Sequence, residues 1–455
     1  MSAVDRALLQ AIEQAASADQ LVADRRDFHR YAESGWTEFR TSSLIARRLE
    51  RLGFAVLAGR SVCAADARMG VPPASVLDAH LLRAIDQGGD PEYVEAARGW
   101  LTGVVASLGG GAGPTVALRF DIDALDLVES DAPTHRPARD GFASVNVGAC
   151  HACGHDGHAA VGLGVAEVLV KLRRLLRGSV KLIFQPAEEG VRGARAIVEA
   201  GHLEDVDILI GHHLITGWGL GEIAPSMNGY AATRKFDVTF EGAAAHAGGS
   251  PEEGRNALLA AATAAIGLHA LPRHRAGFTR VNVGRLEAGT GRNIVPGRAL
   301  LVAEVRGESS ALCDSMYERA MRVVESSASM YGCRAAVRSM GEAGTASCDP
   351  ILAERVKAVG EPWGDFTFES ADRMGGSEDF TEMMRRVQSH GGLATNIGVG
   401  ADFHGVLRNT PDRSSVLGGH TPTFDFDERA MALAVHLLAS LTIDAMQAPG
   451  CNAEP

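Results

Sequence analysis

Five side chains that can bind a transition metal lie within one short segment, GACHACGHDGH (148–158). They are Cys150, His151, Cys153, His155 and His158, with Asp156 among them. Thiolate, imidazole and carboxylate groups are the protein ligands of such metals. The glycines also let the backbone approach an ion closely, because they carry no Cβ. The segment therefore predicts a metal site.

Three other interpretations of this segment are possible. It could be a buried Cys-x-x-Cys pair with core histidines that have their hydrogen-bond partners. A redox Cys-x-x-Cys usually opens a helix in a small βαβ domain, whereas this segment lies deep in a large chain. A structural zinc knuckle needs a second ligand pair at short spacing, and none follows. We favour a metal site completed by residues distant in sequence, as in catalytic sites.

Polar side chains follow three predicted strands, PTVALRFDID, VKLIFQPAEEG and VDILIGHH. These strands deliver Asp121, the pair Glu188–Glu189 and the pair His212–His213. In an α/β sheet, binding sites form at the carboxyl ends of strands, so these side chains are expected to meet.

The candidate ligands have mixed chemistry. They are Cys153, His155, Glu189, His213 and His420. Sulfur, nitrogen and oxygen ligands together suit zinc, manganese or a similar divalent ion, and five of them suggest two ions. Glu188, beside Glu189, could act as the general base for a metal-activated water, the usual arrangement for amide hydrolysis.

The composition excludes some classes of protein. The 455 residues are 46% hydrophobic and 22% charged, with a formal net charge of −12 that argues against a nucleic-acid partner. The seven cysteines are scattered, which predicts a reducing compartment and hence the cytoplasm. The N-terminus does not resemble a signal peptide. The longest mostly apolar stretch, 257–271, is too short to cross a bilayer, so no membrane partner is expected.

The rest of the chain indicates where the domains lie. Residues 3–52 are predicted to be helical, with His29, Glu33 and Glu38 on a solvated face. Residues 60–102 are predicted to form a helical insertion. An α/β pattern follows to residue 228 and returns at 345–455, so these two parts are assigned to one catalytic α/β domain.

Residues 229–344 have a different pattern and are assigned to an inserted α+β domain. RKFDVTFEG alternates strictly between apolar and polar residues, which predicts a half-exposed antiparallel strand. Ser250-Pro251-Glu252-Glu253 predicts a capping box for an apolar helix that ends near Leu271. Two further alternating strands and a helix at 310–330 complete the domain.

Motifs along nearly the whole chain resemble one known family. They are DFHRYAESGWTEFRT, LRFDIDALD, HACGHDGH, FQPAEEG, AHAGGSPEEGRNALLAA, GRNIVPG, GSEDF and H-x-P-x-F-D-F-D-E. Together they are similar to the dinuclear-metal amidohydrolases, which include aminoacylases, hippurate hydrolases and auxin-conjugate hydrolases. This resemblance implies a zinc-peptidase-like catalytic domain with an inserted α+β lid or dimerisation domain.

The resemblance also implies roles for single residues. Glu188 matches the general base, and the five candidate ligands match the family's ligands, with His212 a weaker candidate than His213. The carboxypeptidase branch carries His-x-Asp where this chain has Arg119-Phe-Asp121. One ligand of that branch is therefore absent, and Cys153 is expected to compensate. Asp121 is expected to orient a ligand without binding the ion itself.

In the inserted domain, His246, Asn293 and Arg306 match positions that contact substrate. His246 is expected to reach the active site of a partner protomer, so a homodimer is implied, alone or with a paralogous subunit. Arg306 could bind a substrate carboxylate, because its planar guanidinium matches one. No ion-pair partner for Arg306 is evident in its own strand.

The expected activity is hydrolysis of an N-acyl amino acid with two Mn²⁺ or Zn²⁺ ions per chain. The substrate is expected to be an aromatic acyl-glutamate or acyl-aspartate. Two alternatives remain open: an aminohydrolase that releases ammonia from an aromatic amine, and a catalytically silent subunit of a hetero-oligomer.

Overall fold

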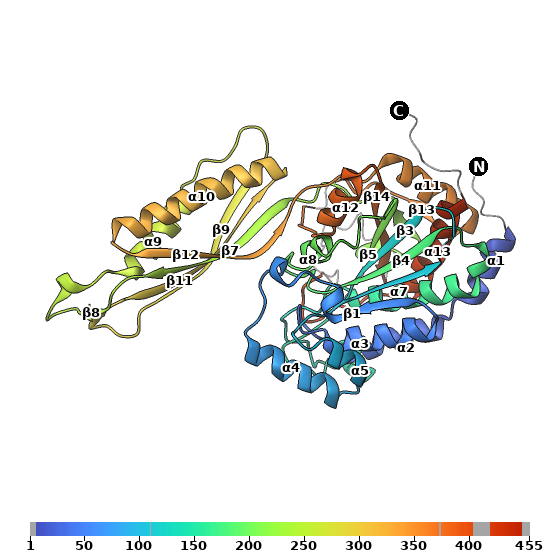
Figure 1. Ribbon diagram of the computed structural model, residues 1–455, viewed down its shortest axis with the longest axis horizontal. Coiled ribbons are helices and arrows are strands. Elements are labelled where there is room, and N and C mark those ends of the chain that lie inside the picture. Colours follow the sequence, from blue (N-terminus) through green and yellow to red (C-terminus); the bar gives the residue numbers. More distant parts are fainter. Residues whose placement is uncertain (1–5, 110, 373–374, 404–418, 448–455) are drawn as a thin grey trace.

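The chain folds into a rounded body and an arm, each built on its own sheet (Figure 1). The structure is a computed structural model, and it describes residues 6–109, 111–372, 375–403 and 419–447. Within these residues the body contains an eight-stranded sheet. Its strands, in spatial order, are β1 (Ala55–Ala58), β2 (Val104–Gly109), β4 (Ser179–Gln185), β3 (Thr115–Asp121), β5 (Ile208–Gly219), β14 (Leu393–Asp402), β6 (Glu222–Ala224) and β13 (Thr367–Phe368).

The centre of this sheet is parallel and buried on both faces. Strand β3 pairs in parallel with β4 and β5, and β5 pairs in parallel with β14. Val116, Leu118 and Phe120 join the core on one face, whereas Ala117 joins the core on the other. Such two-sided burial explains the nearly continuous apolar runs of these strands. It also brings the ends of the parallel strands to one edge.

Helices cover both faces of the sheet (Figure 1). On one face α7 packs against α2, α13 and β3, and on the other α12 packs against α8, β5 and β14. The body helices are α1 (Arg6–Ala15), α2 (Ala18–Arg30), α3 (Phe39–Arg51), α4 (Ala74–Asp86), α5 (Pro91–Ala96), α6 (Arg136–Arg139), α7 (His155–Lys171), α8 (Ala194–Glu199), α11 (Pro350–Gly360), α12 (Phe380–Ser389) and α13 (Arg429–Gln447).

Residues 6–52 are largely helical, as predicted, but they do not form one continuous helix. The chain forms α1, α2 and α3, and it turns sharply between α2 and α3, where Trp36 has a φ of 70°. The predicted solvated face is wrong, because His29, Glu33 and Glu38 are each fully buried. Their polar atoms hydrogen-bond to Asp156 of α7, to the Arg40 amide of α3 and to Thr102, so burial does not leave them unpaired.

The arm is a four-stranded antiparallel sheet with α9 and α10 on one face. Its elements are β12 (Arg334–Ala343), β7 (Ala232–Glu241), β11 (Arg298–Gly307), β9 (Thr279–Ala288), α9 (Ala257–His269) and α10 (Ser310–Met330). The alternation in β7 is confirmed: Phe236, Val238 and Phe240 are buried under the helices. A short pair, β8 (Ala245–His246) with β10 (Ile294–Val295), forms the far tip (Figure 1).

The predicted capping box does not form. Pro251–Glu253 make a 3₁₀ turn, and Ser250 makes no side-chain cap. Helix α9 begins later, at Ala257, and the Asn256 side chain accepts a hydrogen bond from the Leu259 amide at 3.2 Å. Gly254 follows the predicted box at Ser250–Glu253, and Asn256, beyond that glycine, caps the helix instead.

Helix α13 is long and apolar enough to cross a membrane by length and composition, and 78% of its apolar window is buried within the body.

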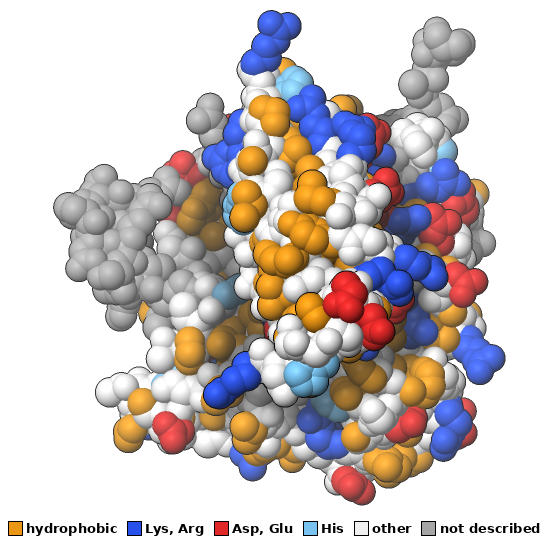
Figure 2. All heavy atoms as spheres, turned by 90° about the vertical axis from the view of Figure 1, so that its left-hand side faces the viewer, with side chains coloured by type: hydrophobic (Ala, Val, Ile, Leu, Met, Phe, Trp, Pro, Cys, Tyr) orange, Lys and Arg blue, Asp and Glu red, His pale blue; other side chains and the backbone are white. Residues whose placement is uncertain are grey.

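The arm exposes apolar side chains. Seen from its tip (Figure 2), hydrophobic side chains gather along it. They include Leu259 and Ile266 on α9, Leu286 on β9 and Ile294 on β10, of which Ile266 is 72% exposed.

Candidate active site

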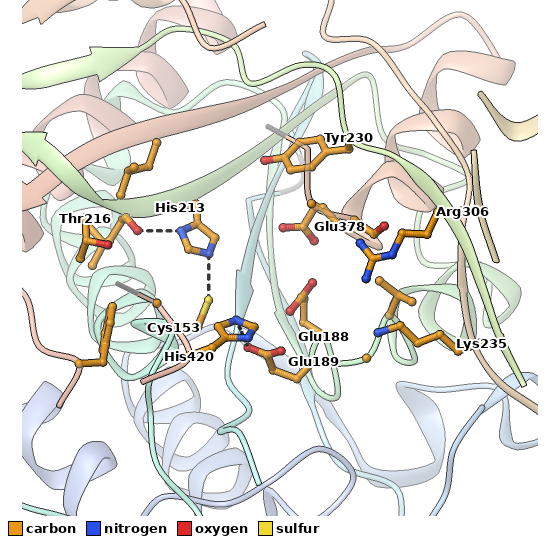
Figure 3. Close-up of a pocket in the computed structure, with 18 residues that line it drawn as sticks. Cys153, Glu188, Glu189, His213, Thr216, Tyr230, Lys235, Arg306, Glu378 and His420 are labelled. Atoms are coloured by element: carbon orange, nitrogen blue, oxygen red, sulfur yellow. Dashed lines mark hydrogen bonds and ion pairs between the residues drawn. The ribbon is translucent and has the colours of Figure 1, made fainter. Parts of the chain in front are cut away.

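A cleft of about 360 Å³ opens where the body meets the arm. Six of the predicted site residues line it: Cys153, Glu188, Glu189, His213, Arg306 and His420. In Figure 3, Cys153, His213 and His420 lie on one side, Arg306 lies on the opposite side, and Glu188 lies between them. His155 is 1% exposed and lies within ligand distance of Cys153, His213 and the glutamates. The structure thus brings together residues from five separate parts of the chain.

Helix α7 places His155 at its first position, after Gly154 in the left-handed conformation (φ 93°). The His155 Nδ1 lies 2.8 Å from the Asp123 carbonyl oxygen. A carbonyl only accepts, so Nδ1 carries a proton, and Nε2 is the nitrogen that could bind a cation once its own proton has left. This buried Nε2 has no hydrogen-bond partner among the described residues. It is therefore available as a ligand.

The two glutamates lie on a loop that several buried carboxylates hold in place. The Asp123 carboxylate accepts hydrogen bonds from the Glu188 and Glu189 amides at 2.9 and 3.0 Å. Glu38 accepts one from the Ala187 amide at 2.8 Å. Ala187 has a φ of 52°, which is unfavourable for a residue with a side chain. These bonds stabilise the strained loop and fix the direction of both glutamates.

Strand β5 does not end at the histidine pair, as the sequence indicates, but continues to Gly219. Neighbouring residues of a strand face opposite sides, so the pair divides. His213 lines the cleft, and its Nδ1 donates to the Leu214 carbonyl at 2.7 Å, which leaves Nε2 facing the Cys153 sulfur at 3.5 Å. His212 is buried against Phe120 instead. The geometry thus favours His213 over His212.

The Asp121 carboxylate lies 3.7 Å from His155 Nε2 and makes its hydrogen bonds to other residues. It accepts from Nδ1 of His158 and, at 2.6 Å, from Arg119. The other nitrogen of His158 accepts from the Leu214 amide at 2.9 Å. Asp121 therefore positions the β5 segment that carries His213, acting through His158. The group that orients His155 is the Asp123 carbonyl, a role that sequence reasoning missed.

The electrostatics of the cleft favour a cation. Although burial raises the pKa of the Cys153 thiol, His155 and His213 hold it well below its ordinary value. Burial, together with Glu378 and Glu189, raises the pKa of Glu188 well above its ordinary value. Several buried acidic groups that repel one another are stabilised when a cation binds among them.

The donor set fits two divalent ions. Several triads have ligand atoms within 4.8 Å of one another, among them Cys153–His155–His213, Cys153–Glu189–His420, His155–Glu188–Glu189 and Asp121–His155–His158. The His155 Nε2 lacks a hydrogen-bond partner among the described residues, and a Glu189 oxygen lies 3.3 Å from His420 Nε2. A thiolate, three imidazoles and a carboxylate match the ligands of Zn²⁺ or Mn²⁺.

Two predicted substrate residues lie elsewhere. His246 and Asn293 are neighbours at the tip of the arm, where the Ala247 amide donates to the Asn293 carbonyl at 3.0 Å. His246 is exposed and does not line the cleft of its own chain. Its Nδ1 accepts from the Gly248 and Gly249 amides at 3.1 and 2.9 Å, so its proton lies on Nε2.

Sequence reasoning missed three cleft residues. Glu378 and Tyr230 line the cleft, and so does Lys235 of β7. Glu378 stands in GSEDF, a motif whose glycines and following helix indicate only a loop. The adjacent acidic residues Glu378 and Asp379 were the signal that could have identified this motif as part of the site. Lys235 belongs to the polar face of an alternating strand, and alternation does not reveal which exposed positions face a cleft.

Comparison with known proteins places this geometry in a family. Residues 117–442 match the profile of peptidase family M20/M25/M40. Indole-3-acetyl-aspartic acid hydrolase of Enterobacter agglomerans is 48% identical over 91% of this chain and 93% of its own. One of the subunits of p-aminobenzoyl-glutamate hydrolase from Escherichia coli is 45% identical over 92% of this chain and 94% of its own.

Solved structures agree. The aminobenzoyl-glutamate utilization protein of Klebsiella pneumoniae superposes with a TM-score of 0.81 and 42% identity, over 96% of this chain and 98% of its own. A Bacillus subtilis protein described as a dinuclear metal binding peptidase of the M20 family gives a TM-score of 0.63 and 25% identity, over 94% of this chain and 98% of its own.

The chain belongs to peptidase family M20/M25/M40 and is an amide hydrolase of that family. The segments DARMGVP and HRPARDGFAS indicate, within this family, a likeness to p-aminobenzoyl-glutamate hydrolase. The identity of 45% to the Escherichia coli protein confirms that likeness.

Proposed function

We propose that this chain hydrolyses the amide bond between an aromatic acyl group and glutamate or aspartate. The observation that carries the proposal is the convergence of a thiolate, three histidines and two glutamates on one cleft that also contains Arg306. The two relatives named above act on an indole-3-acetyl-aspartate and on a p-aminobenzoyl-glutamate, according to their names.

The walls of the cleft suit this substrate. Val191, Leu214, Ile215 and Phe424 offer apolar surface to an aromatic acyl group. Arg306 lies on the opposite side of Glu188 from the ligand cluster (Figure 3), where its guanidinium could bind the carboxylate of the amino acid. An amide held between the two sides would place its carbonyl carbon near Glu188.

Cys153, His155, Glu189, His213 and His420 would hold two ions, Mn²⁺ or Zn²⁺. When bound, such ions polarise the amide carbonyl and make water a better nucleophile. Glu188 would accept the proton of the attacking water and then donate it to the leaving amine nitrogen. The backbone amide of Glu188 donates a hydrogen bond to Asp123, which fixes the position from which the carboxylate would make this transfer.

The purified chain supplemented with Mn²⁺ or Zn²⁺ tests the proposal. We expect release of glutamate from p-aminobenzoyl-glutamate or of aspartate from indole-3-acetyl-aspartate, measured by chromatography. Ammonia without free amino acid would favour the aminohydrolase alternative. If the chain binds metal but cleaves neither compound until a second type of subunit is added, its role as an enzyme on its own would be wrong.

We further propose that the chain acts as a homodimer joined through the arm. The apolar side chains that the arm exposes, Leu259 and Ile266 among them, could be covered by a second copy. The Escherichia coli relative carries the name of one subunit, which describes that protein as part of a larger assembly. A paralogous partner is therefore the alternative to a second copy.

A further inference from the structure

Lys235 is a cation in the cleft that nothing in the activity described so far uses. It lies near the start of β7, lines the cleft, and faces the same open space as Glu188 and Arg306 (Figure 3). Its ammonium group makes no hydrogen bond or ion pair with any residue that the structure describes. A partly buried charge without a partner is costly, so such a group is usually kept to bind something.

The two cations of the cleft differ in what they contact. Arg306 is bound by Glu304 in the same strand, at 2.9 Å from Nε and 3.2 Å from Nη2. The expectation that Arg306 lacks an ion-pair partner is therefore wrong, because residues two apart in a strand share a face. Lys235 stands directly opposite Glu304 in the register of β7 and β11, yet they form no ion pair. Lys235 is thus the more available cation.

The spacing of the two cations suits a ligand with two carboxylates. Arg306 stands opposite Thr233, so Lys235 and Arg306 are diagonal neighbours on one face of the sheet. Diagonal neighbours lie roughly 7–8 Å apart, within reach of long side chains. Burial lowers the pKa of Lys235, and Glu304 and Glu188 oppose that shift. An acidic group of the substrate would further stabilise the charged amine.

We propose that Lys235 binds the side-chain carboxylate of the substrate's acidic amino acid, while Arg306 binds the α-carboxylate. This inference rests on the proposed function, since it assumes cleavage of acyl-amino acids. It adds the residue that distinguishes glutamate or aspartate from a neutral amino acid. Arg306 alone could not make that distinction, because every amino acid has an α-carboxylate.

The test compares p-aminobenzoyl-glutamate with p-aminobenzoyl-alanine, which have the same acyl group. In Lys235→Met, which keeps most of the apolar stem, kcat/KM for the glutamate compound should fall by roughly 30-fold or more. For the alanine compound it should change by less than about threefold. The loss should lie mainly in KM, and Lys235→Arg should restore part of the preference.

A matched control is Lys357→Met, which removes an exposed lysine of α11 that pairs with Glu354 and should leave both rates unchanged. Thermal unfolding would verify that Lys235→Met is folded. Equal losses on both substrates, or an unchanged preference for glutamate, would overturn the inference while the proposed function stands. If the metal-loaded wild-type chain cleaves no acyl-amino acid, both the proposed function and the role of Lys235 are wrong.

Discussion

At the scale of single residues, two adjacent glutamates are assigned different tasks. Both belong to a triad with His155, but Glu189 also belongs to one with Cys153 and His420, whereas Glu188 lies nearer the centre of the cleft. Both amides are bound by the same carboxylate, Asp123. A small shift of this loop would therefore move base and ligand together. Metal content and turnover, measured separately, distinguish the two roles.

Glu188→Gln should keep the metal but slow turnover by about 10²-fold or more, because the amide cannot accept the proton of water. Metal content by elemental analysis and kcat on p-aminobenzoyl-glutamate are the two measurements. If the variant instead loses metal, the roles of Glu188 and Glu189 are reversed.

Cys153→Ala and His420→Ala should each lower bound metal and activity together, because each removes a ligand from a triad. Cys63→Ala is the matched control: it removes a buried thiol that lies outside the cleft and should retain the metal. Full metal occupancy and full activity in both ligand variants would contradict the assignment.

Arg306→Ala should weaken transition-state binding of p-aminobenzoyl-glutamate by about 2 to 5 kcal/mol, because a substrate carboxylate would lose its bidentate partner. An aromatic amide without a carboxylate should be affected much less. Steady-state kinetics on both compounds measure this difference. Equal losses would show that Arg306 supports the fold of the cleft, through Glu304, rather than the substrate.

At the scale of elements, helix α7 depends on a buried ion-pair network behind it. Asp156, next to His155, is bound by Arg25 at 2.8 Å and by His29 at 2.7 Å. Arg25 also binds Asp425 at 2.9 Å, in the segment just before α13. The network therefore connects α2, α7 and the C-terminal part of the chain behind the predicted ligands.

Arg25→Ala should lower the free energy of unfolding by about 3–5 kcal/mol, because it leaves buried carboxylates without their cation. Urea denaturation at fixed metal concentration measures the loss. Arg26→Ala is the control: Arg26 is 36% exposed, pairs with Glu428, and should cost less than about 1 kcal/mol. Similar losses in both variants would mean that the network contributes no more than a surface pair.

Much of this arrangement could be predicted from the sequence, because ligands grouped in HACGHDGH and at strand ends follow from local rules. The apolar runs defined β3, β4 and β5, and strict alternation defined β7. The predictions that failed concerned features that the sequence pattern does not show. Ser250 matched a capping pattern, but Asn256 caps α9 instead. The burial of Glu33 could not be foreseen from a helical pattern.

The choice between neighbouring residues was also beyond the sequence. His212 and His213 differ only in the face of β5 that they occupy, and the face depends on where the strand ends. Lys235 was one of four polar residues on an alternating strand. Only the placement of the arm beside the body shows that it faces the cleft.

At the scale of the whole molecule, the arm separates residues that are expected to act together. His246 belongs to β8, which forms the tip of the arm (Figure 1). The cleft lies where the arm meets the body. His246 carries its proton on Nε2, so it can donate to an oxyanion. A second copy, bound through the arm, would be the means of bringing this donor to a cleft.

Two variants should therefore complement each other. His246→Ala and Glu188→Gln should each be nearly inactive alone. Mixed under conditions of subunit exchange, they should form hybrid dimers with one intact site, which regain part of the activity. Mass spectrometry of the intact dimers would verify the exchange. No regained activity in proven hybrids would show that His246 does not act across the interface.

The order of strands in the body has a consequence for synthesis on the ribosome. Strand β14 lies between β5 and β6, although the whole arm separates it from them in sequence. The nascent chain can complete the arm while β5 still has an unpaired edge, and His420 follows later still. The proposed ligand set is thus completed only after the arm and β14 have been synthesised, and a chain truncated after the arm would expose an aggregation-prone strand.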